Sequence, residues 1–277
     1  MKGYKRLLLY GCLLAAVLVA MLALKRGSLL SKTPAPRDYA EIAGEGVLRI
    51  ITPYSTPGYY IAGGRAEGFQ YELSRAIASL SGLEVELSLE MSIAESFAAL
   101  LDNRCDIIAQ NIPVTSDMKA LYLFTEPIVL GKDILVQRTA EANCGVKPVR
   151  NHLELAGKTI YVAKGSPALL RLKHLEEEIG DSVFIKEDDT YSSEQLSIMV
   201  AGGEIDYAVS DYQEAMALKN ELPQIDIETD ISFTQLQAWA VRKDAPALAD
   251  SLNSWFSRMR AQGIFDPIYR RYYGGGE

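Results

Sequence analysis

The sequence has 277 residues, of which 48% are hydrophobic, and its formal net charge at pH 7 is −8. Residues 1–26 contain five Lys and Arg and no acid, so the rest of the chain holds 23 bases against 36 acids, a charge of −13. This acidic balance, with no basic stripe, argues against nucleic acid or an anionic membrane surface as a partner, and the length suffices for two lobes with sizeable cores.

The first predicted element is an apolar segment near the N-terminus. Residues 7–24 contain no charged side chain, and at ~1.5 Å per residue this run is just long enough to span the hydrocarbon core of a membrane. A cleaved signal peptide and a lipoprotein signal at Cys12 are the alternatives, but no Ala-x-Ala site follows the run and Tyr10 is bulky for a lipobox. We therefore predict an uncleaved N-terminal transmembrane helix, within an anchor or signal of residues 1–26.

The first half of the remaining chain alternates strands and helices. Residues 27–45 predict a linker because Pro34 and Pro36 occur among mixed charges with little periodicity. The chain then predicts, in order, a strand, a helix, an alternating half-buried strand, a helix and a buried strand. These elements begin near Val47, Gly68, Leu83, Ile93 and Asp106. This order is typical of one doubly wound α/β half.

The second half repeats the same order and then returns to the first. Strands are predicted at residues 134–136, 157–163, 183–185, 205–211 and 237–241, with helices at 167–179, 195–201, 246–261 and 265–273. We therefore predict an α/β protein of two doubly wound lobes joined by two crossover strands. Lobe 1 comprises residues 46–138 and 237–277, and lobe 2 comprises residues 139–236.

Several short motifs resemble those of family 3 periplasmic solute-binding proteins. Residues 68–73 resemble the family's entry to its first helix, Gly-Phe-x-x-Asp/Glu-Leu, and residues 205–211 resemble its Ile/Val-Asp-x-x-x-x-Asp segment. Residues 105–128, with their Thr-Glu-Pro stop, and residues 263–269 resemble two further stretches. The resemblance covers residues 46–274 and implies a type II periplasmic binding fold, whose two lobes close on a ligand.

Candidate ligand-binding residues lie at the ends of the predicted strands, where ligands of open α/β sheets bind. They are Tyr54, Asn111, Pro113, Thr115, Ser166 and Asp211. The resemblance implies that Asn111 and Thr115 face a ligand carboxylate and that Asp211 pairs with a ligand ammonium. Local roles remain open: turn bonding for Asn111 and Thr115, and helix capping for Ser166 and Asp211.

One departure from the family pattern bears on the ligand. Amino-acid binders of the family carry an Arg three residues after the conserved Thr, where its planar fork holds the α-carboxylate. Here that position is Met118, and Lys119 is turned away by one helical step of ~100°. Unless Arg65 or Lys164 substitutes, the sequence disfavours a free α-amino acid and favours a peptide fragment, a modified amino acid or a piece of cell wall.

No enzyme motif stands out. His152 and His174 are the only histidines and have no metal-ligand spacing. No Gly-x-Ser-x-Gly, Walker or dinucleotide motif occurs, so we expect neither cofactor nor metal, and binding without turnover. A dehydratase on the same fold, using Asp211 or Glu72 as acid or base, is the less favoured alternative.

The predicted function is that of a membrane-tethered receptor on the periplasmic side of the bacterial inner membrane, anchored by residues 7–24. The anchor, residues 46–60 and residues 124–128 also resemble the binding module of membrane-bound lytic transglycosylases of the F type. We expect the protein to bind a small-molecule ligand and to serve uptake through an ABC permease. The alternative is a sensory module that acts with a cell-wall enzyme.

Overall fold

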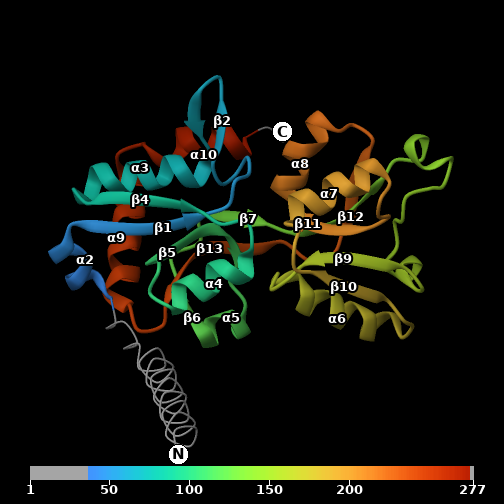
Figure 1. Ribbon diagram of the computed structural model, residues 1–277, viewed down its shortest axis with the longest axis horizontal. Helices are drawn as coiled ribbons and strands as arrows, with labels where there is room; N and C mark the ends of the chain where they lie inside the picture. The colour runs from blue at the N-terminus through green and yellow to red at the C-terminus, as the bar shows by residue number, and fades with distance from the viewer. Residues whose placement is uncertain (1–36, 275–277) are drawn as a thin grey trace, which may run out of the picture. The chain divides into compact units, whose positions relative to one another are not determined.

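Figure 1 shows the computed structural model, which describes residues 37–274 as two α/β lobes, each built on one main sheet, with β2 and β3 forming a separate antiparallel pair in lobe 1. The predicted transmembrane helix, the anchor or signal of residues 1–26 and most of the predicted linker lie outside the described residues. Between residues 37 and 274, no helix combines the length and apolar character that crossing a membrane requires.

Lobe 1 has a mixed sheet in the order β4-β1-β5-β13-β6, with β7 also paired to β13. Strands β1, β4 and β5 are parallel, and β13 runs antiparallel to β5, β6 and β7. Its elements are α2 (Tyr39–Glu45), β1 (Val47–Thr52), β2 (Tyr60–Ala62), β3 (Arg65–Glu67), α3 (Phe69–Ser81), β4 (Glu84–Leu89), α4 (Ile93–Leu101), β5 (Ile107–Pro113), α5 (Ser116–Leu121), β6 (Tyr122–Phe124), β7 (Val129–Gly131), β13 (Gln235–Arg242), α9 (Pro246–Ala261) and α10 (Phe265–Tyr273).

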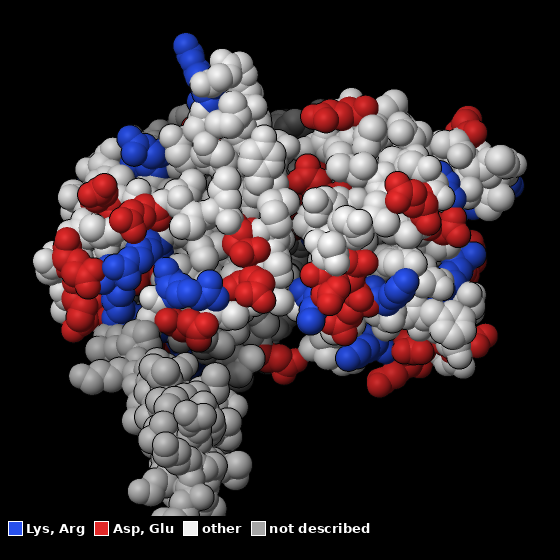
Figure 2. Space-filling model, viewed as in Figure 1, with Lys and Arg blue, Asp and Glu red and all other residues white. Residues whose placement is uncertain are grey.

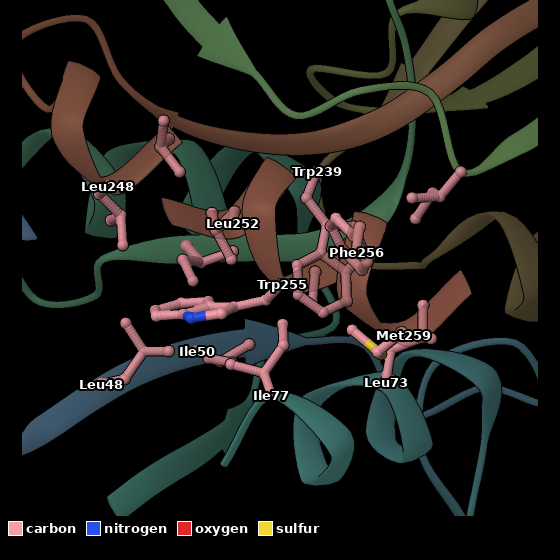
Figure 3. Close-up of a cluster of buried hydrophobic side chains, with 14 of the residues drawn as sticks. Leu48, Ile50, Leu73, Ile77, Trp239, Leu248, Leu252, Trp255, Phe256 and Met259 are labelled. Carbon is pink, nitrogen blue, oxygen red and sulfur yellow. The ribbon is translucent and has the colours of Figure 1, made fainter. Parts of the chain in front are cut away.

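The main core of lobe 1 lies where β1, α3, β13 and α9 meet (Figure 3). Leu73 and Ile77 are four residues apart on α3, so they share one face of the helix and pack toward the same cluster. Trp239 from β13 is the largest fully buried side chain and contacts the ring of Phe256 edge-on. Each such side chain stabilises the fold by about 1.5–3 kcal/mol when it leaves water, so this cluster fixes the strand ends that border the site.

Lobe 2 has a sheet in the order β10-β9-β11-β8-β12, with β8 antiparallel to both of its neighbours. Its helices α6 and α7 follow β9 and β10 in the chain, as the predicted alternation requires, and a further helix, α8, follows β11. Its elements are β8 (Asp133–Arg138), η1 (Glu141–Asn143), η2 (His152–Leu155), β9 (Thr159–Ala163), α6 (Ala168–Ile179), β10 (Phe184–Asp188), α7 (Ser193–Gly202), β11 (Ala208–Asp211), α8 (Tyr212–Glu221) and β12 (Ile225–Asp230).

The boundary between the lobes differs from the predicted one. The sequence predicts that lobe 1 continues to residue 138, but all of β8 pairs with β11 and β12 in the second sheet. The reason is that Ile134, Leu135 and Val136 are fully buried in lobe 2. The chain therefore leaves the first sheet after Gly131 and returns to it at Gln235, two residues before the predicted return.

The linker prediction is wrong for its last residues, because residues 39–45 form the helix α2. Asp38 and Glu41 make a capping box at its start, and Ile42 is fully buried in the core of lobe 1. Just before it, Arg37 donates from Nε to the buried carboxylate of Asp106 at 2.8 Å. The folded unit thus begins by residue 37.

A candidate ligand-binding site between the lobes

A cavity of about 90 Å³ lies between the two lobes and receives residues from both. Lobe 1 contributes residues 53–55, which follow β1, and residues 110–113 from the end of β5. Lobe 2 contributes residues 166–168 after β9, residues 192–194 at the start of α7 and residues 209–211 from β11. The volume is several times what one water molecule needs, and most of these segments lie at the carboxyl ends of strands, where α/β sheets bind ligands.

The structure brings most of the predicted site residues to this cavity. Tyr54, Asn111, Pro113, Ser166 and Asp211 line it. Asp211 also has the local role that the sequence left open, because it caps α8 by accepting from the backbone N–H of Gln213 at 2.9 Å. Ser166 accepts from the backbone N–H of Ala168 at 3.3 Å, but the N-cap residue of α6 is Pro167. For Asp211, a capping role and a place in the cavity therefore coexist.

Thr115 does not line the cavity. Its hydroxyl oxygen accepts a 3.3 Å hydrogen bond from the backbone N–H of Met118 and caps the short helix α5. We expect Thr115→Ala to lower the free energy of unfolding by about 1 kcal/mol, the usual cost of a lost N-cap, with ligand affinity unchanged. Urea unfolding and calorimetry test this, and a loss of affinity without a loss of stability would place Thr115 at the ligand instead.

A chain of hydrogen bonds fixes the side chain of Asn111. The indole N–H of Trp239 donates to Gln70 Oε1 at 2.6 Å, and Gln70 Nε2 donates to Asn111 Oδ1 at 2.8 Å. Asn111 Nδ2 then donates to the hydroxyl of Tyr273 at 2.9 Å. Gln70 also lines the cavity, and sequence reasoning missed it. Both ends of the Asn111 amide are therefore held within lobe 1 in a defined orientation at the cavity wall.

Three carboxylates gather on the lobe 2 side of the cavity. Asp133 and Asp211 lie directly opposite each other in the antiparallel pair of β8 and β11, and Glu214 follows one turn into α8. Glu214 accepts hydrogen bonds from the hydroxyls of Ser193 and Ser210, at 2.6 and 3.3 Å. The sequence pointed to Asp211 alone, because the pairing of β8 with β11 is a property of the fold.

The protein environment raises the pKa of all three carboxyl groups. Burial, followed by the charge of Asp211, raises the pKa of Asp133 to about 7 and that of Glu214 also to about 7. Burial raises the pKa of Asp211 as well, against hydrogen bonds from Gln237 and from the backbone of α8 that lower it. Perturbed carboxyl groups in a cleft are a mark of functional sites, and here they place titrating acids at neutral pH on the cavity wall.

Comparison with known proteins identifies the family. Residues 48–275 match the family described as bacterial extracellular solute-binding proteins, family 3. The chain belongs to this family. The match covers most of the chain and confirms the resemblance drawn from the short motifs.

This family 3 solute-binding protein is similar in sequence to part of a larger curated protein. It is 29% identical over 233 residues to the membrane-bound lytic murein transglycosylase F of Desulfosudis oleivorans, which covers 84% of this chain and 50% of the relative. The chain thus spans about half the length of the curated relatives it matches first. The enzymatic activity in the names of these relatives therefore describes the relatives, which are about twice as long as the region they share with this chain.

Solved structures confirm the two-lobed fold. An ancestral arginine-binding protein bound to arginine has a TM-score of 0.72 at 24% identity, covering 82% of this chain and 98% of that one. The substrate-binding protein of an amino acid ABC transporter has a TM-score of 0.71 at 20% identity, covering 82% and 99%. At these identities the likeness establishes the fold alone.

This family 3 solute-binding protein lines its cavity without a cationic side chain. Among residues 37–274, those at the cavity include no Lys, Arg or His. Met118, at the predicted clamp position, packs against the core of lobe 1, while Lys119, Arg65 and Lys164 are exposed and lie outside the cavity lining. On the face shown in Figure 2, Lys and Arg are scattered among Asp and Glu without a continuous basic patch.

Gly131 and Gln237 meet where β7 and β13 run side by side in the sheet of lobe 1. Gln237 Nε2 donates to Asp211 Oδ2 at 2.8 Å, so a lobe 1 strand reaches a lobe 2 carboxylate. The Gln237 amide lies so close to Gly131 that a Cβ there would be 2.3 Å from Oε1 and 2.5 Å from Nε2. Glycine at position 131 therefore makes room for the amide that bonds Asp211.

We expect Gly131→Ala to push this amide away and to break its hydrogen bond to Asp211. Hydrogen bonds to charged groups contribute about 1.5 kcal/mol or more, which at ~2–4 °C per kcal/mol corresponds to several degrees in the melting temperature at pH 8. Thermal unfolding measures the loss. The matched control is Gly44→Ala in α2, where a Cβ meets nothing within 4 Å and stability should stay the same or rise. Equal melting temperatures for both variants would contradict the prediction.

Proposed function

We propose that this family 3 solute-binding protein holds a small polar ligand in the cavity between its lobes, closes on it and releases it unchanged. The observation that carries the proposal is the cavity itself, which presents polar side chains from both lobes at the carboxyl ends of their strands. Two short connections, at residues 131–133 and 230–235, join the sheets. Changes of backbone torsion in a few such residues are sufficient for closure of one lobe on the other.

For the setting we propose the periplasmic side of the inner membrane, with residues 7–24 as the tether, and uptake of the ligand through an ABC permease. The family's description as extracellular solute-binding proteins supports the compartment. The fold shared with the binding protein of an amino acid ABC transporter is compatible with delivery to a permease.

A second candidate is a regulatory module for cell-wall cleavage. The similarity to membrane-bound lytic murein transglycosylase F over 84% of this chain favours it, because the matched region covers only half of that relative. In this setting the ligand is a fragment of the cell wall, and closure of the lobes signals its presence to a wall-cleaving enzyme.

A thermal-shift screen of the full-length chain in detergent tests both candidates. The panel contains amino acids, amines, short peptides, muropeptides and sugars. A ligand at 100 times its Kd should stabilise the protein by about 2.7 kcal/mol. Stabilisation by amino acids or amines supports uptake, and stabilisation by wall fragments alone supports the regulatory module. A panel without any stabilising compound would contradict small-ligand binding at this cavity.

The variant Asp211→Ala, compared with the exposed control Glu177→Gln, ties any hit to the cavity. We expect the first variant to abolish the thermal shift of an amino-bearing hit and the control to retain it. A full shift in Asp211→Ala would locate the ligand elsewhere.

A further inference from the structure

We propose that the occupant of this cavity is a small organic cation that carries at least one ammonium group and no carboxylate. The inference rests on the proposed function, since it names the chemical class of ligand for the same cavity. Four independent features of the described residues lead to it.

First, the chain leaves the cavity acids without a cation while it pairs its other buried acids. Asp106 is paired with Arg37 at 2.8 Å, and Asp226 with Arg150 at 2.6 Å. Among residues 37–274, no ion pair involves Asp133, Asp211 or Glu214. Within residues 37–274, the two fully paired buried acids thus have a cation of the chain beside them, whereas the three acids at the cavity have none.

Second, the acids are placed close together. Asp133 and Asp211 are directly opposed across two antiparallel strands, where side chains lie about 4.5–5.5 Å apart at Cβ and like charges destabilise the sheet. Lys132, next to Asp133 in the chain, is engaged with Asp230 at 2.6 Å and lies over the ring of Tyr212. A cation between the two Asp side chains would convert their repulsion into attraction.

Third, an acceptor beside these acids lacks a donor. Gln237 lines the cavity, is 1% exposed, and its Oε1 has no hydrogen-bond partner among the described residues. Its Nε2 already serves Asp211. An ammonium group offers three donors and no acceptor, so it matches a wall that presents carboxylates and a free amide oxygen.

Fourth, the cavity offers nothing cationic to a ligand carboxylate. In the described part of the chain, its charged lining residues are Asp133, Asp211, Glu214 and Glu194, all acidic. The rest of the wall includes apolar side chains suited to a short alkyl chain, such as Met91, Ile93 and Pro167. A free amino acid would bring a carboxylate into an acidic cavity without a clamp, whereas an amine brings only the complementary charge.

Binding of such a ligand should release protons. Asp133 and Glu214 have a pKa of about 7 in the empty protein, chiefly because burial disfavours their charged forms. The titratable groups that act on them are Asp211, which affects both, and Glu194 and the hydroxyl of Tyr273, which affect Glu214. Burial raises the pKa of Tyr273 well above its usual value. Lys132 is engaged with Asp230 instead. A bound ammonium favours the carboxylates, so affinity should increase between pH 6 and pH 8.

Two pairs of compounds that differ by one carboxylate test the ligand class on the full-length chain. Calorimetry compares L-lysine with 1,5-diaminopentane, and L-arginine with agmatine. We expect the decarboxylated member of at least one pair to bind, with a Kd at least tenfold lower than that of its amino acid, and with protons released into the buffer. Tighter binding of the amino acids would overturn the proposal.

These experiments distinguish a failure of the proposed ligand class from a failure of the proposed function. If a sugar or a neutral peptide stabilises the protein while all four compounds fail, the cavity binds a ligand and the cation proposal is wrong. If nothing in the wider panel binds, the proposed function itself fails.

Variants locate the amine and separate a binding role from a structural one. Asp133→Asn and Glu214→Gln should each weaken amine binding at least tenfold at pH 8 while raising the melting temperature of the empty protein. The control Glu177→Gln, on the exposed face of α6, should change neither. Unaltered amine affinity in both cavity variants would overturn the assignment, and a lowered melting temperature would indicate a structural role.

Discussion

The double substitution Asp133→Asn and Glu214→Gln is expected to raise the free energy of unfolding of the empty protein by about 2–4 kcal/mol at pH 8. Both groups have a pKa of about 7 in the folded protein, above their ordinary values of 3.8 and 4.5. One pKa unit corresponds to 1.36 kcal/mol, and we reduce the sum by about half because both side chains are partly exposed and solvent screens them.

The sign of the pH dependence follows from these values. A carboxyl group with a raised pKa binds its proton more tightly in the folded state, so the wild-type protein loses stability as the pH rises from about 4 to 7. Removing both titrating groups abolishes this loss, and the advantage of the variant should therefore grow up to about pH 7 and stay constant above it. Urea unfolding at several pH values measures the difference.

Asp226→Asn provides a control of opposite sign. Its hydrogen bonds and ion pair with Arg150 lower the pKa of Asp226 in spite of burial, so its charged form stabilises the folded state above the unfolded pKa. This variant should lose stability at pH 8. The prediction for the cavity acids fails if the double variant is no more stable than the wild type at pH 8.

The substitution Asp106→Asn is expected to destabilise the protein by about 3–5 kcal/mol. Asp106 is fully buried and accepts from Arg37 Nε and from the backbone N–H of Arg49, at 2.8 and 2.9 Å. Removing its charge leaves the buried guanidinium of Arg37 with Glu45, whose side chain is about half exposed, as its remaining ion-pair partner. Breaking a buried ion pair by removing one charge is strongly destabilising.

A matched surface pair shows whether burial is the cause. Asp102 lies 3.7 Å from Arg104, and both side chains are more than half exposed. Asp102→Asn should therefore change stability by no more than about 1 kcal/mol. Urea unfolding with an unchanged m-value measures both variants. Losses of similar size at positions 102 and 106 would contradict the prediction.

Long periodic segments of this chain could be predicted from the sequence alone. The helices α9 and α10 begin and end at the predicted residues, and α4 begins at the predicted one, because apolar residues at helical spacing and a Pro in the first turn of α9 mark them clearly. The short helix α2 was missed, since seven residues with one buried side chain give almost no periodicity. Its capping box, from Asp38 to Glu41, was the available signal.

Residues at strand ends could be predicted as neighbours of the cavity, but their partners could not. Tyr54, Asn111 and Asp211 lie at the carboxyl ends of strands, and sheet topology brings such ends together. Asp133 and Gln237 reach the same cavity only through strand pairings between residues far apart in the chain. The sequence also predicted a cavity residue, Thr115, that does not line the cavity. A Thr that caps a helix and a Thr that binds a ligand at a strand end have the same sequence pattern.

The local sequence pattern also could not predict that β8 belongs to lobe 2. Its run of Ile134, Leu135 and Val136 suits the buried interior of either sheet. Only the register with β11 and β12 decides the sheet.

The order of elements has a consequence for the order of folding during synthesis. Lobe 2 is one continuous stretch of chain, whereas lobe 1 is assembled from segments on both sides of it. Until β13 and α9 are translated, Ile50 and Leu73 lack the Trp239 and Phe256 rings that complete their core. Because domains form as units while the chain emerges, lobe 2 can be complete while lobe 1 still exposes an apolar face. We therefore expect the nascent first lobe, rather than the second, to be the part of the chain that is prone to aggregation before synthesis is complete.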